Sequence, residues 1–399
     1  MPRQAQKHLL TVVTNLLGAG SFMRSALRGI HAYTQESGRW ILRLLPWDFR
    51  PGRLTAWVPH GLILLPHDAQ HLRRIRKTIG RRVPIVSVST NWIRRGVGVV
   101  CPDDQAIGRL AAEHLLSLGL RHFACLGYPI PGYSTSRQLA FCRLLAARGF
   151  RCARYRWQLG PPELIHETSM NPDLRSWVAS LPKPVGIFAV NDHLAWELSE
   201  LCHMAGFAIP DQVALIGVDN DEILCEISWP PLSSVNVPGM RVGYAAAALL
   251  GRMMNGAPPP SKPIRIPPLG VATRHSTNLL AVDDPHVARA LRFVRDRLGH
   301  KITVRDVAAI AGVGRRTLER RFKEILGRSI PEEIRRARIE SACRLLATTH
   351  RKVQDIAESL GFPYPQRFYS QFRRAMGLSP AKWRRQAQFR LPAPPPHKA

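Results

Sequence analysis

The sequence predicts a chain of two fold classes, an α/β part over residues 1–280 followed by an all-α part over residues 281–390. Short apolar runs alternate with helical patterns in the first part, which is typical of parallel sheets whose strands are joined by helices. In the second part the apolar residues follow helical spacing, and the same pattern recurs about 50 residues later. The second part is also far more basic than the first.

Six runs rich in Val, Ile and Leu are predicted to be buried strands: Leu9–Thr14, Leu62–Pro66, Pro84–Ser89, Phe123–Leu126, Val185–Val190 and Val213–Val218. Helices are predicted between several of them: Ser21–Ser37, Ala106–Ser117, Ser136–Arg148 and Leu194–Ala205. This alternation indicates parallel strands with right-handed crossovers, covered by helices on both faces. The start of the chain mimics a signal peptide, but Thr11, Thr14 and Asn15 interrupt its apolar run and favour a strand instead.

Polar side chains follow the predicted strands at the edge where ligands of parallel α/β sheets bind. They are Asn15, Asp103 and Asp104, Asn191 and Asp192, and Asp219 to Asp221. Carboxylates and amides suit the hydroxyl groups of a sugar, which need both donors and acceptors. The alternative is that these residues cap the helices that follow, above all at Asp103 and Asp192.

Several motifs, taken in order, resemble the LacI/GalR regulators and the periplasmic sugar-binding proteins. They are Asp103-Asp104-x-x-x-Gly108-Arg109, Gly119-Leu-Arg121-His122, Arg137-x-x-x-Phe141, Asn191-Asp192-x-x-Ala195, Gly217-Val-Asp219-Asn220, Pro231-Leu-Ser-Ser-Val235 and Arg274-x-Ser-Thr277. The resemblance implies a type I periplasmic-binding-protein-like sensor with two α/β lobes and an effector between them.

The same resemblance implies ligand roles for Asp103, Arg137, Asn191 and Asp219, to which we add Asn15 after the first strand. The guanidinium of Arg137 would clamp hydroxyls or a carboxylate. One departure stands out: LacI/GalR regulators begin with a helix-turn-helix, whereas this sequence begins with the first strand. Binding to DNA would therefore require another part of the chain.

The boundary between the two parts is predicted at the polar stretch 278–285, after a proline-rich segment, 255–270, that cannot form a long helix. The first part is thus a sensor over residues 1–280, and the second a DNA-binding domain over residues 281–390. The proline-rich tail, residues 391–399, is predicted to be disordered.

The second part contains an internal repeat of a helix-turn-helix. One copy has its apolar residues at Val304, Val307, Ala308 and Ala311, and the other at Val353, Ile356, Ala357 and Leu360. The pair Leu318 and Phe322 then matches Phe368 and Phe372 in the second copy. The run from Phe368 through Gly377-x-Ser379-Pro380 to Trp383 resembles the DNA-binding domain of the AraC/XylS activators. Trp383 is predicted to be a core anchor.

If those apolar pairs face inward, the opposite helix faces would meet base edges in the major groove. These outward residues are Arg315, Arg316, Glu319 and Arg320 in the first copy and Gln366, Arg367 and Ser370 in the second. The alternative is that the arginines touch only phosphates or solvent. We predict phosphate contacts for Arg321, Arg373 and Arg374.

The net charge and the cysteine content limit the classes of function that the sequence allows. The chain carries 57 Lys and Arg against 28 Asp and Glu, and residues 285–399 carry a net +17 of the total +29. An excess of this size indicates an acidic partner such as nucleic acid, although a solvated basic surface is the simpler alternative. The seven cysteines are irregularly spaced and predict neither a disulfide framework nor a metal site, and no apolar run is long enough to span a membrane.

Together these features predict a cytoplasmic, nucleoid-associated transcription regulator without catalytic activity or a cofactor. The order of a LacI-like sensor and an AraC-type domain resembles the bacterial regulators of xylose operons, which implies D-xylose as effector, activation of transcription and RNA polymerase as a partner. A regulator of another pentose or polyol is the alternative. An α/β enzyme acting on a small sugar is more remote because nucleophile, phosphate-loop, zinc and dinucleotide motifs are all missing from the sequence. A homodimer built by the sensors is also predicted.

Overall fold

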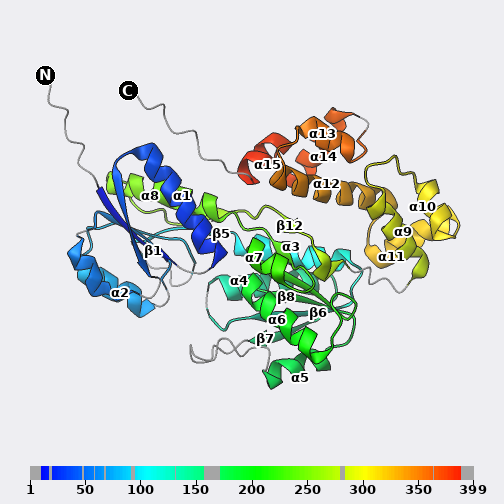
Figure 1. The fold of residues 1–399 in the computed structure, drawn as a ribbon, viewed down its shortest axis with the longest axis horizontal. Helices are drawn as coiled ribbons and strands as arrows, with labels where there is room; N and C mark the ends of the chain where they lie inside the picture. The colour runs from blue at the N-terminus through cyan, green and yellow to red at the C-terminus, as the bar shows by residue number, and fades with distance from the viewer. Residues whose placement is uncertain are drawn as a thin grey trace.

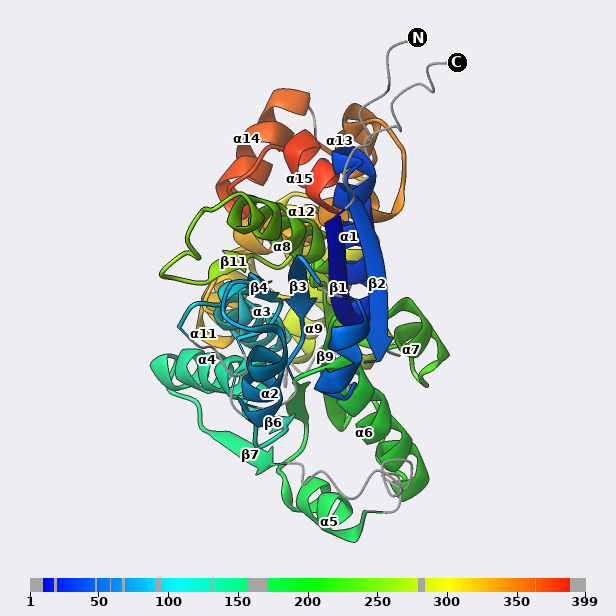
Figure 2. The same ribbon diagram turned by 90° about the vertical axis from the view of Figure 1, so that its left-hand side faces the viewer.

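The computed structural model describes residues 10–387 except 18–19, 47–48, 58, 67–68, 91–94, 131, 157–170, 279–283 and 363. Two α/β lobes form the N-terminal part, and a helical domain lies along one side of both lobes (Figures 1 and 2). Among the described residues, no helix combines the length and the apolar character that crossing a membrane requires.

Lobe 1 is built on a six-stranded sheet with the order β11-β5-β4-β3-β1-β2, in which every neighbouring pair is parallel. Its strands are β1 (Leu10–Leu17), β2 (Trp40–Pro46), β3 (Gly61–Leu64), β4 (Ile85–Ser87), β5 (Gly98–Pro102) and β11 (Ile264–Ile266). Helices α1 (Ser21–Ser37) and α8 (Gly239–Met254) pack on one face. Helix α2 (Ala69–Ile79) and the 3-10 helix η1 (Pro51–Ala56) pack on the other.

Lobe 2 has a second six-stranded sheet with the order β12-β10-β9-β8-β6-β7, parallel except for β12 against β10. Its strands are β6 (His122–Gly127), β7 (Cys152–Arg156), β8 (Val185–Ala189), β9 (Val213–Val218), β10 (Ser233–Val235) and β12 (Val271–Ala272). The helices are α3 (Asp104–Ser117), α4 (Tyr133–Ala147), α5 (Pro172–Ser180), α6 (Asp192–Ala205), α7 (Glu222–Ile227) and the short η4 (His275–Thr277). One apolar core joins the sheet to these helices.

The chain passes between the two lobes three times. It leaves lobe 1 after β5, returns between β10 and α8, and leaves again between β11 and β12. Lobe 1 is therefore assembled from two separate stretches of sequence, residues 10–102 and 239–266. Between those stretches α1 and α8 pack very closely, because a Cβ atom added at Gly243 would lie 1.8 Å from the carbonyl oxygen of Ala26.

The helical domain contains two helix-turn-helix units joined by one long helix. The helices are α9 (Pro285–Asp296), α10 (Val304–Ala311), α11 (Arg315–Leu326), α12 (Ile330–Thr348), α13 (Val353–Ser359), α14 (Pro365–Met376) and α15 (Pro380–Ala387). Leu318 and Phe322 lie in one apolar core, and Phe368 and Phe372 lie in another, all fully buried as predicted. Trp383 is 4% exposed and packs at 6.0 Å from the Phe372 ring, so its predicted role as an anchor is confirmed.

Most predicted elements are present, with some differences. Helix Ser21–Ser37 has the predicted bounds, and the proline-rich segment 255–270 contains strand β11, in agreement with the prediction that it cannot form a long helix. Strand β1 continues to Leu17, so the prediction that Asn15 follows the strand is wrong: Asn15 lies within it, at an irregularity after Thr14 beyond which Leu17 pairs with Pro46 of β2. Most of the predicted linker, 279–283, and the predicted tail, 391–399, lie outside the described residues.

Candidate ligand site and candidate DNA interface

Arg137 is the centre of a buried group of charges in lobe 2, which we call the charged cluster: Asp104, Arg137 and Asp219. Helix α4 carries Arg137, whose Nε donates to Asp104 Oδ1 at 2.9 Å. Its Nη1 donates to the carbonyl of Val190 at 2.7 Å and lies 3.8 Å from Asp219 Oδ1. The side chains of Arg137 and Asp104 are only 5% and 2% exposed, whereas that of Asp219 is 21% exposed. Asp219 is thus the most solvent-accessible member of the cluster.

The loop after β9 holds Asp219 in an unusual backbone conformation. Its φ angle is 106°, and that of Asn220 is 52°, a region that residues other than glycine seldom adopt. Asp192 supports the loop, because its carboxyl oxygens accept hydrogen bonds from the Asp221 amide at 2.7 Å and the Ser234 hydroxyl at 2.6 Å. Arg274 also binds Asn220 Oδ1 at 2.9 Å. Backbone strain held by a buried network is a feature of functional sites.

Burial sets the protonation of these carboxyl groups. Burial raises the pKa of Asp219 to about 6, although the charge of Arg137 opposes the increase. Burial and the nearby charge of Asp219 raise the pKa of Asp192 to about 8, even with its hydrogen bonds from Ser234 and Asp221. At neutral pH Asp192 is therefore mostly protonated, whereas Asp219 is mostly a carboxylate.

Two tyrosines that the sequence did not single out belong to the same site. The guanidinium of Arg137 lies over the ring of Tyr133, 5.0 Å from its centroid. The Tyr128 side chain hydrogen-bonds with Asn191, and burial raises its pKa to about 12. Aromatic rings beside polar groups suit a sugar, which presents hydroxyls at its edge and apolar C–H groups on its faces. Their place after β6 was the signal that could have identified them.

Four of the five predicted ligand residues gather near the charged cluster, but several also have structural contacts. Asp103 and Asn191 cap α3 and α6 by accepting from the amides of Ala106 at 3.1 Å and Leu194 at 2.9 Å. These caps are the alternative that the sequence left open. Asn15 lies in lobe 1, where its side chain binds both the amide and the carbonyl of Leu65, at 2.8 and 3.0 Å.

A cavity of about 710 Å³ opens where the two lobes meet, and we call it the interlobe cavity. The beginning of α1 lines it from lobe 1, and residues 219–223, which lead into α7, line it from lobe 2. The lobe crossings at 236–239 and 269–274 line it as well, together with Cys343 and Trp383 of the helical domain. Arg24 of lobe 1 lies 3.4 Å from Asp221 of lobe 2. Of the five predicted ligand residues, Asp219 is the one that lines the cavity. The volume of the cavity is within the range of small-molecule sites.

The helical domain presents the predicted DNA-contacting residues on α11 and α14. Arg315, Arg316 and Arg320 are exposed on α11, and Gln366, Arg367 and Ser370 on α14. Two of the arginines form ion pairs within α11, Arg315 with Glu319 at 3.0 Å and Arg320 with Glu324 at 2.9 Å.

The predicted phosphate contacts differ in their surroundings. Arg373 and Arg374 are exposed near the end of α14. Arg321 is half-buried, and its Nη1 donates to Asp284 Oδ2 at 2.6 Å. Asp284 also caps α9, so Arg321 connects α9 with α11.

The helical domain contacts the sensor at several points. Thr273, beside β12, donates to Glu340 of α12 at 2.6 Å, and Arg328 donates to the carbonyl of Ser117 at 3.0 Å. Leu269 lies on the third crossing between the lobes and packs in the apolar core of the second helix-turn-helix. The segment that joins the lobes therefore forms part of the hydrophobic core of the helical domain.

Comparison with known proteins agrees with this architecture. A periplasmic binding protein-like domain matches residues 112–277, and a helix-turn-helix domain matches residues 307–386. The xylose operon regulatory protein of Escherichia coli K12 is 30% identical over 389 residues, covering 95% of this chain and 97% of its own. That of Haemophilus influenzae is 32% identical over 289 residues, covering 71% of this chain and 74% of its own.

Solved structures give the same result. A structure described as a xylose-binding transcription activator has a TM-score of 0.59 and 29% identity, covering 94% of this chain and 97% of its own. The sensor alone shares its fold with a regulator from Alkaliphilus metalliredigens complexed with D-xylulofuranose, at a TM-score of 0.56 and 19% identity, over 67% of this chain and 98% of that one. The chain has the domains of a DNA-binding transcription regulator, not of an enzyme, and it belongs to the family of the xylose operon regulatory proteins.

Proposed function

We propose that this protein activates transcription in response to D-xylose, which binds between the lobes of the sensor. The family relationship over nearly the whole chain supports this proposal, since the relatives are named for the xylose operon and a similar structure is described as a xylose-binding activator. Another pentose or a polyol is the alternative effector. The observation that carries the proposal is the position of Asp219, which belongs to the charged cluster and also lines the interlobe cavity.

In this proposal Asp219 and Arg137 bind sugar hydroxyls directly. Asp219 accepts hydrogen bonds, and Arg137 offers guanidinium donors that are held in place by Asp104 and the Val190 carbonyl. Asn191 contributes through its amide beside Tyr128. Asp103 and Asn15 act at the edges of the site, since both have hydrogen bonds to the backbone.

The proposed division of the chain assigns sensing to residues 1–280 and DNA binding to residues 281–390. The two helix-turn-helix units would enter successive major grooves on one face of the duplex, about 34 Å apart. Arg316 is the leading candidate for a base contact, because it is exposed on α11 and no ion pair is found for it among the described residues. Arg315, Glu319 and Arg320 on the same helix, and Gln366, Arg367 and Ser370 on α14, are the other proposed base contacts.

The remaining positive charges are proposed to contact phosphates. Arg373 and Arg374 are free to do so from the end of α14. Arg321 would first have to leave Asp284, so its proposed phosphate contact is the weakest of the three.

We further propose that the effector signal reaches the DNA-binding domain through Leu269 and Glu340. Closing the lobes around a sugar moves the crossing segments, and Leu269 on the third crossing packs in the core of the second helix-turn-helix. A ligand shifts such an equilibrium only by its different affinity for the two forms. We propose that the sensors form a homodimer, so that closure changes the spacing of two DNA-binding domains, and that the protein acts at the nucleoid in the cytoplasm together with RNA polymerase.

Calorimetry with D-xylose, L-arabinose, D-ribose, xylitol and D-glucose tests the effector. D-xylose should bind with one site per chain, and Asp219→Ala should weaken binding while the thermal unfolding of the protein stays unchanged. The matched control is Asp211→Ala, an exposed carboxylate outside the site. Tighter binding of another sugar would change the effector, and the absence of any sugar binding would refute the sensor proposal.

A further inference from the structure

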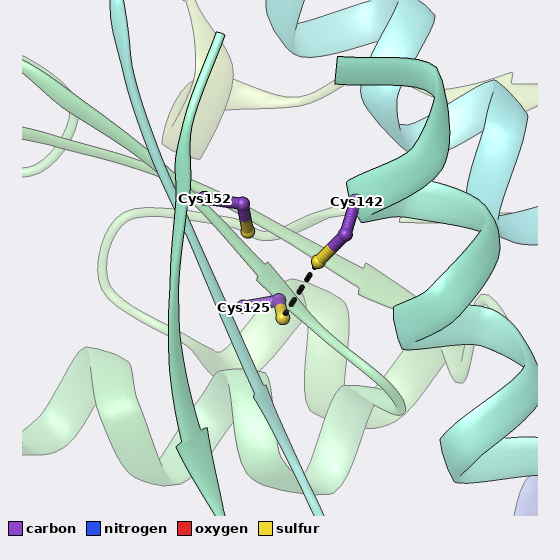
Figure 3. Close-up of side chains that lie close together, drawn as sticks. All are labelled: Cys125, Cys142 and Cys152. Carbon is purple, nitrogen blue, oxygen red and sulfur yellow. Dashed lines mark hydrogen bonds between the residues drawn. The ribbon is translucent and has the colours of Figure 1, made fainter. Parts of the chain in front are cut away.

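Three cysteines of lobe 2 converge although they are far apart in sequence. Cys125 lies on β6, Cys142 on α4 and Cys152 on β7, and their three sulfur atoms all lie within 4.8 Å of one another (Figure 3). The Sγ atoms of Cys125 and Cys142 are 3.9 Å apart, and all three thiols are free. We call this group the cysteine cluster.

The fold explains why these side chains meet. Arg154 pairs with Cys125 across β6 and β7, and Cys152 is two residues before it, so Cys125 and Cys152 project from the same face of the sheet. Helix α4 covers that face and places Cys142 one turn after Gln138, which accepts from Cys125 Sγ at 3.9 Å. Strands and a helix therefore hold the three sulfur atoms in place, as a preorganised site requires.

The spacing of the sulfur atoms matches one metal ion bound by all three. A metal–sulfur distance of about 2.3 Å places three sulfurs about 4.0 Å apart when they surround an ion in one plane. Among the described residues, no further Cys, His, Asp or Glu joins the group as a fourth donor. Structural zinc sites need four ligands, whereas thiolates also select the soft ion Cu⁺.

We propose that Cys125, Cys142 and Cys152 form a three-sulfur site for Cu⁺. Binding replaces the proton of each thiol with a bond to copper, and the three protons pass to solvent. Three thiolates and one Cu⁺ leave two negative charges, and Arg154 lies close enough for its positive charge to act on Cys142 and Cys152. Both of these side chains are half-buried, which gives the ion a way in, while Cys125 is buried.

None of the three cysteines lines the interlobe cavity, and copper binding is measured without sugar, so the two proposals can fail independently. The test uses the full-length protein, reduced and kept free of oxygen, and titrates it with Cu⁺ against a colorimetric copper chelator. The variant is Cys142→Ser, at the half-buried edge of the cluster, where a hydroxyl is tolerated. The matched control is Cys343→Ser, a half-buried cysteine of α12 in the other domain.

The wild-type protein should take up one Cu⁺ per chain, with a thiolate-to-copper charge-transfer band and an X-ray absorption spectrum that contains three sulfur neighbours. Cys142→Ser should bind at least about tenfold more weakly, because even the loss of a residue that only supports a ligand costs that much. Cys343→Ser should bind like the wild type.

Three results would overturn the proposal. Equal Cu⁺ binding by Cys142→Ser would place the ion elsewhere, and no retention of Cu⁺ against the chelator would remove the site. A preference for Zn²⁺ with a nitrogen or oxygen neighbour would show a different site. Thermal unfolding of Cys142→Ser like that of the wild type shows that the variant is folded, and Cys142→Ala serves if it is not.

Discussion

Replacing Arg137 with methionine should destabilise the sensor strongly, because it leaves a buried carboxylate without its partner. Asp104 is 2% exposed and accepts from Arg137 at 2.9 Å, so its negative charge has almost no access to water. Breaking a buried ion pair by removing one partner costs roughly 3–5 kcal/mol. Asp219 adds to this cost, because burial already raises its pKa to about 6 and the charge of Arg137 is what opposes that increase, although its 21% exposed side chain is better hydrated than that of Asp104.

The free energy of unfolding that Arg137→Met removes should increase as the pH rises. Burial raises the pKa of Asp104 above its usual value, with Arg137 opposing the increase, and the loss of Arg137 raises that pKa further. A carboxyl group whose pKa is higher in the folded than in the unfolded protein stabilises the fold at low pH and loses this effect as pH rises. The variant should therefore be closest to the wild type in mild acid and fall behind it toward neutral pH.

Urea unfolding followed by circular dichroism at several pH values measures this difference. The double variant Arg137→Met with Asp104→Asn removes the buried charge and should recover at least half of the lost free energy of unfolding at neutral pH. A single variant that costs less than about 1 kcal/mol would contradict the argument, as would a double variant no more stable than the single one.

Three further outcomes follow from the other contacts. The affinity for D-xylose should fall as pH drops through about 6, because the pKa of Asp219 lies there and the carboxylate accepts from a hydroxyl more strongly than the neutral, protonated group does. Calorimetry should show that Asp219→Asn binds at least about tenfold more weakly and without this pH dependence. Arg316→Ala should cost roughly 1–3 kcal/mol of DNA-binding free energy and relax specificity in one half-site. Arg373→Ala should instead weaken binding to all DNA sequences alike and make the affinity less dependent on salt concentration, and gel-shift assays at several salt concentrations distinguish the two effects. Leu269→Ala should leave sugar binding intact but reduce its effect on DNA affinity, and an unchanged effect would refute the coupling through Leu269.

The elements that the sequence predicted best have one clearly apolar face. Helix Ser21–Ser37 and the inward pairs of α11 and α14 were correct because their apolar residues recur at helical spacing against a buried core. Strands β2 and β7 were missed, since each is the edge strand of its sheet and several of its residues are exposed or half-buried. Their polar residues conceal the strand pattern.

The candidate site was predictable only in part, because its residues act through distant partners. Position after a strand pointed to Arg137's neighbours Asn191 and Asp219, but it could not show that Asp104 would bind Arg137 from 33 positions earlier in the chain. Nor could irregular spacing show that Cys125, Cys142 and Cys152 would meet, since strand register and helix packing bring them together. Contacts of this kind depend on the tertiary fold.

The three crossings between the lobes also determine the order in which the two lobes are completed during translation. Once residue 235 has emerged, lobe 2 lacks its last strand, β12, and the short η4, whereas lobe 1 still lacks helix α8 and strand β11. The face of its β1-to-β5 sheet that α8 will cover therefore stays open from the end of β5 at Pro102 until α8 ends at Met254. Since a nascent apolar surface of this kind is prone to aggregation, chaperones that hold exposed segments should matter most for the half of the sensor that is made first.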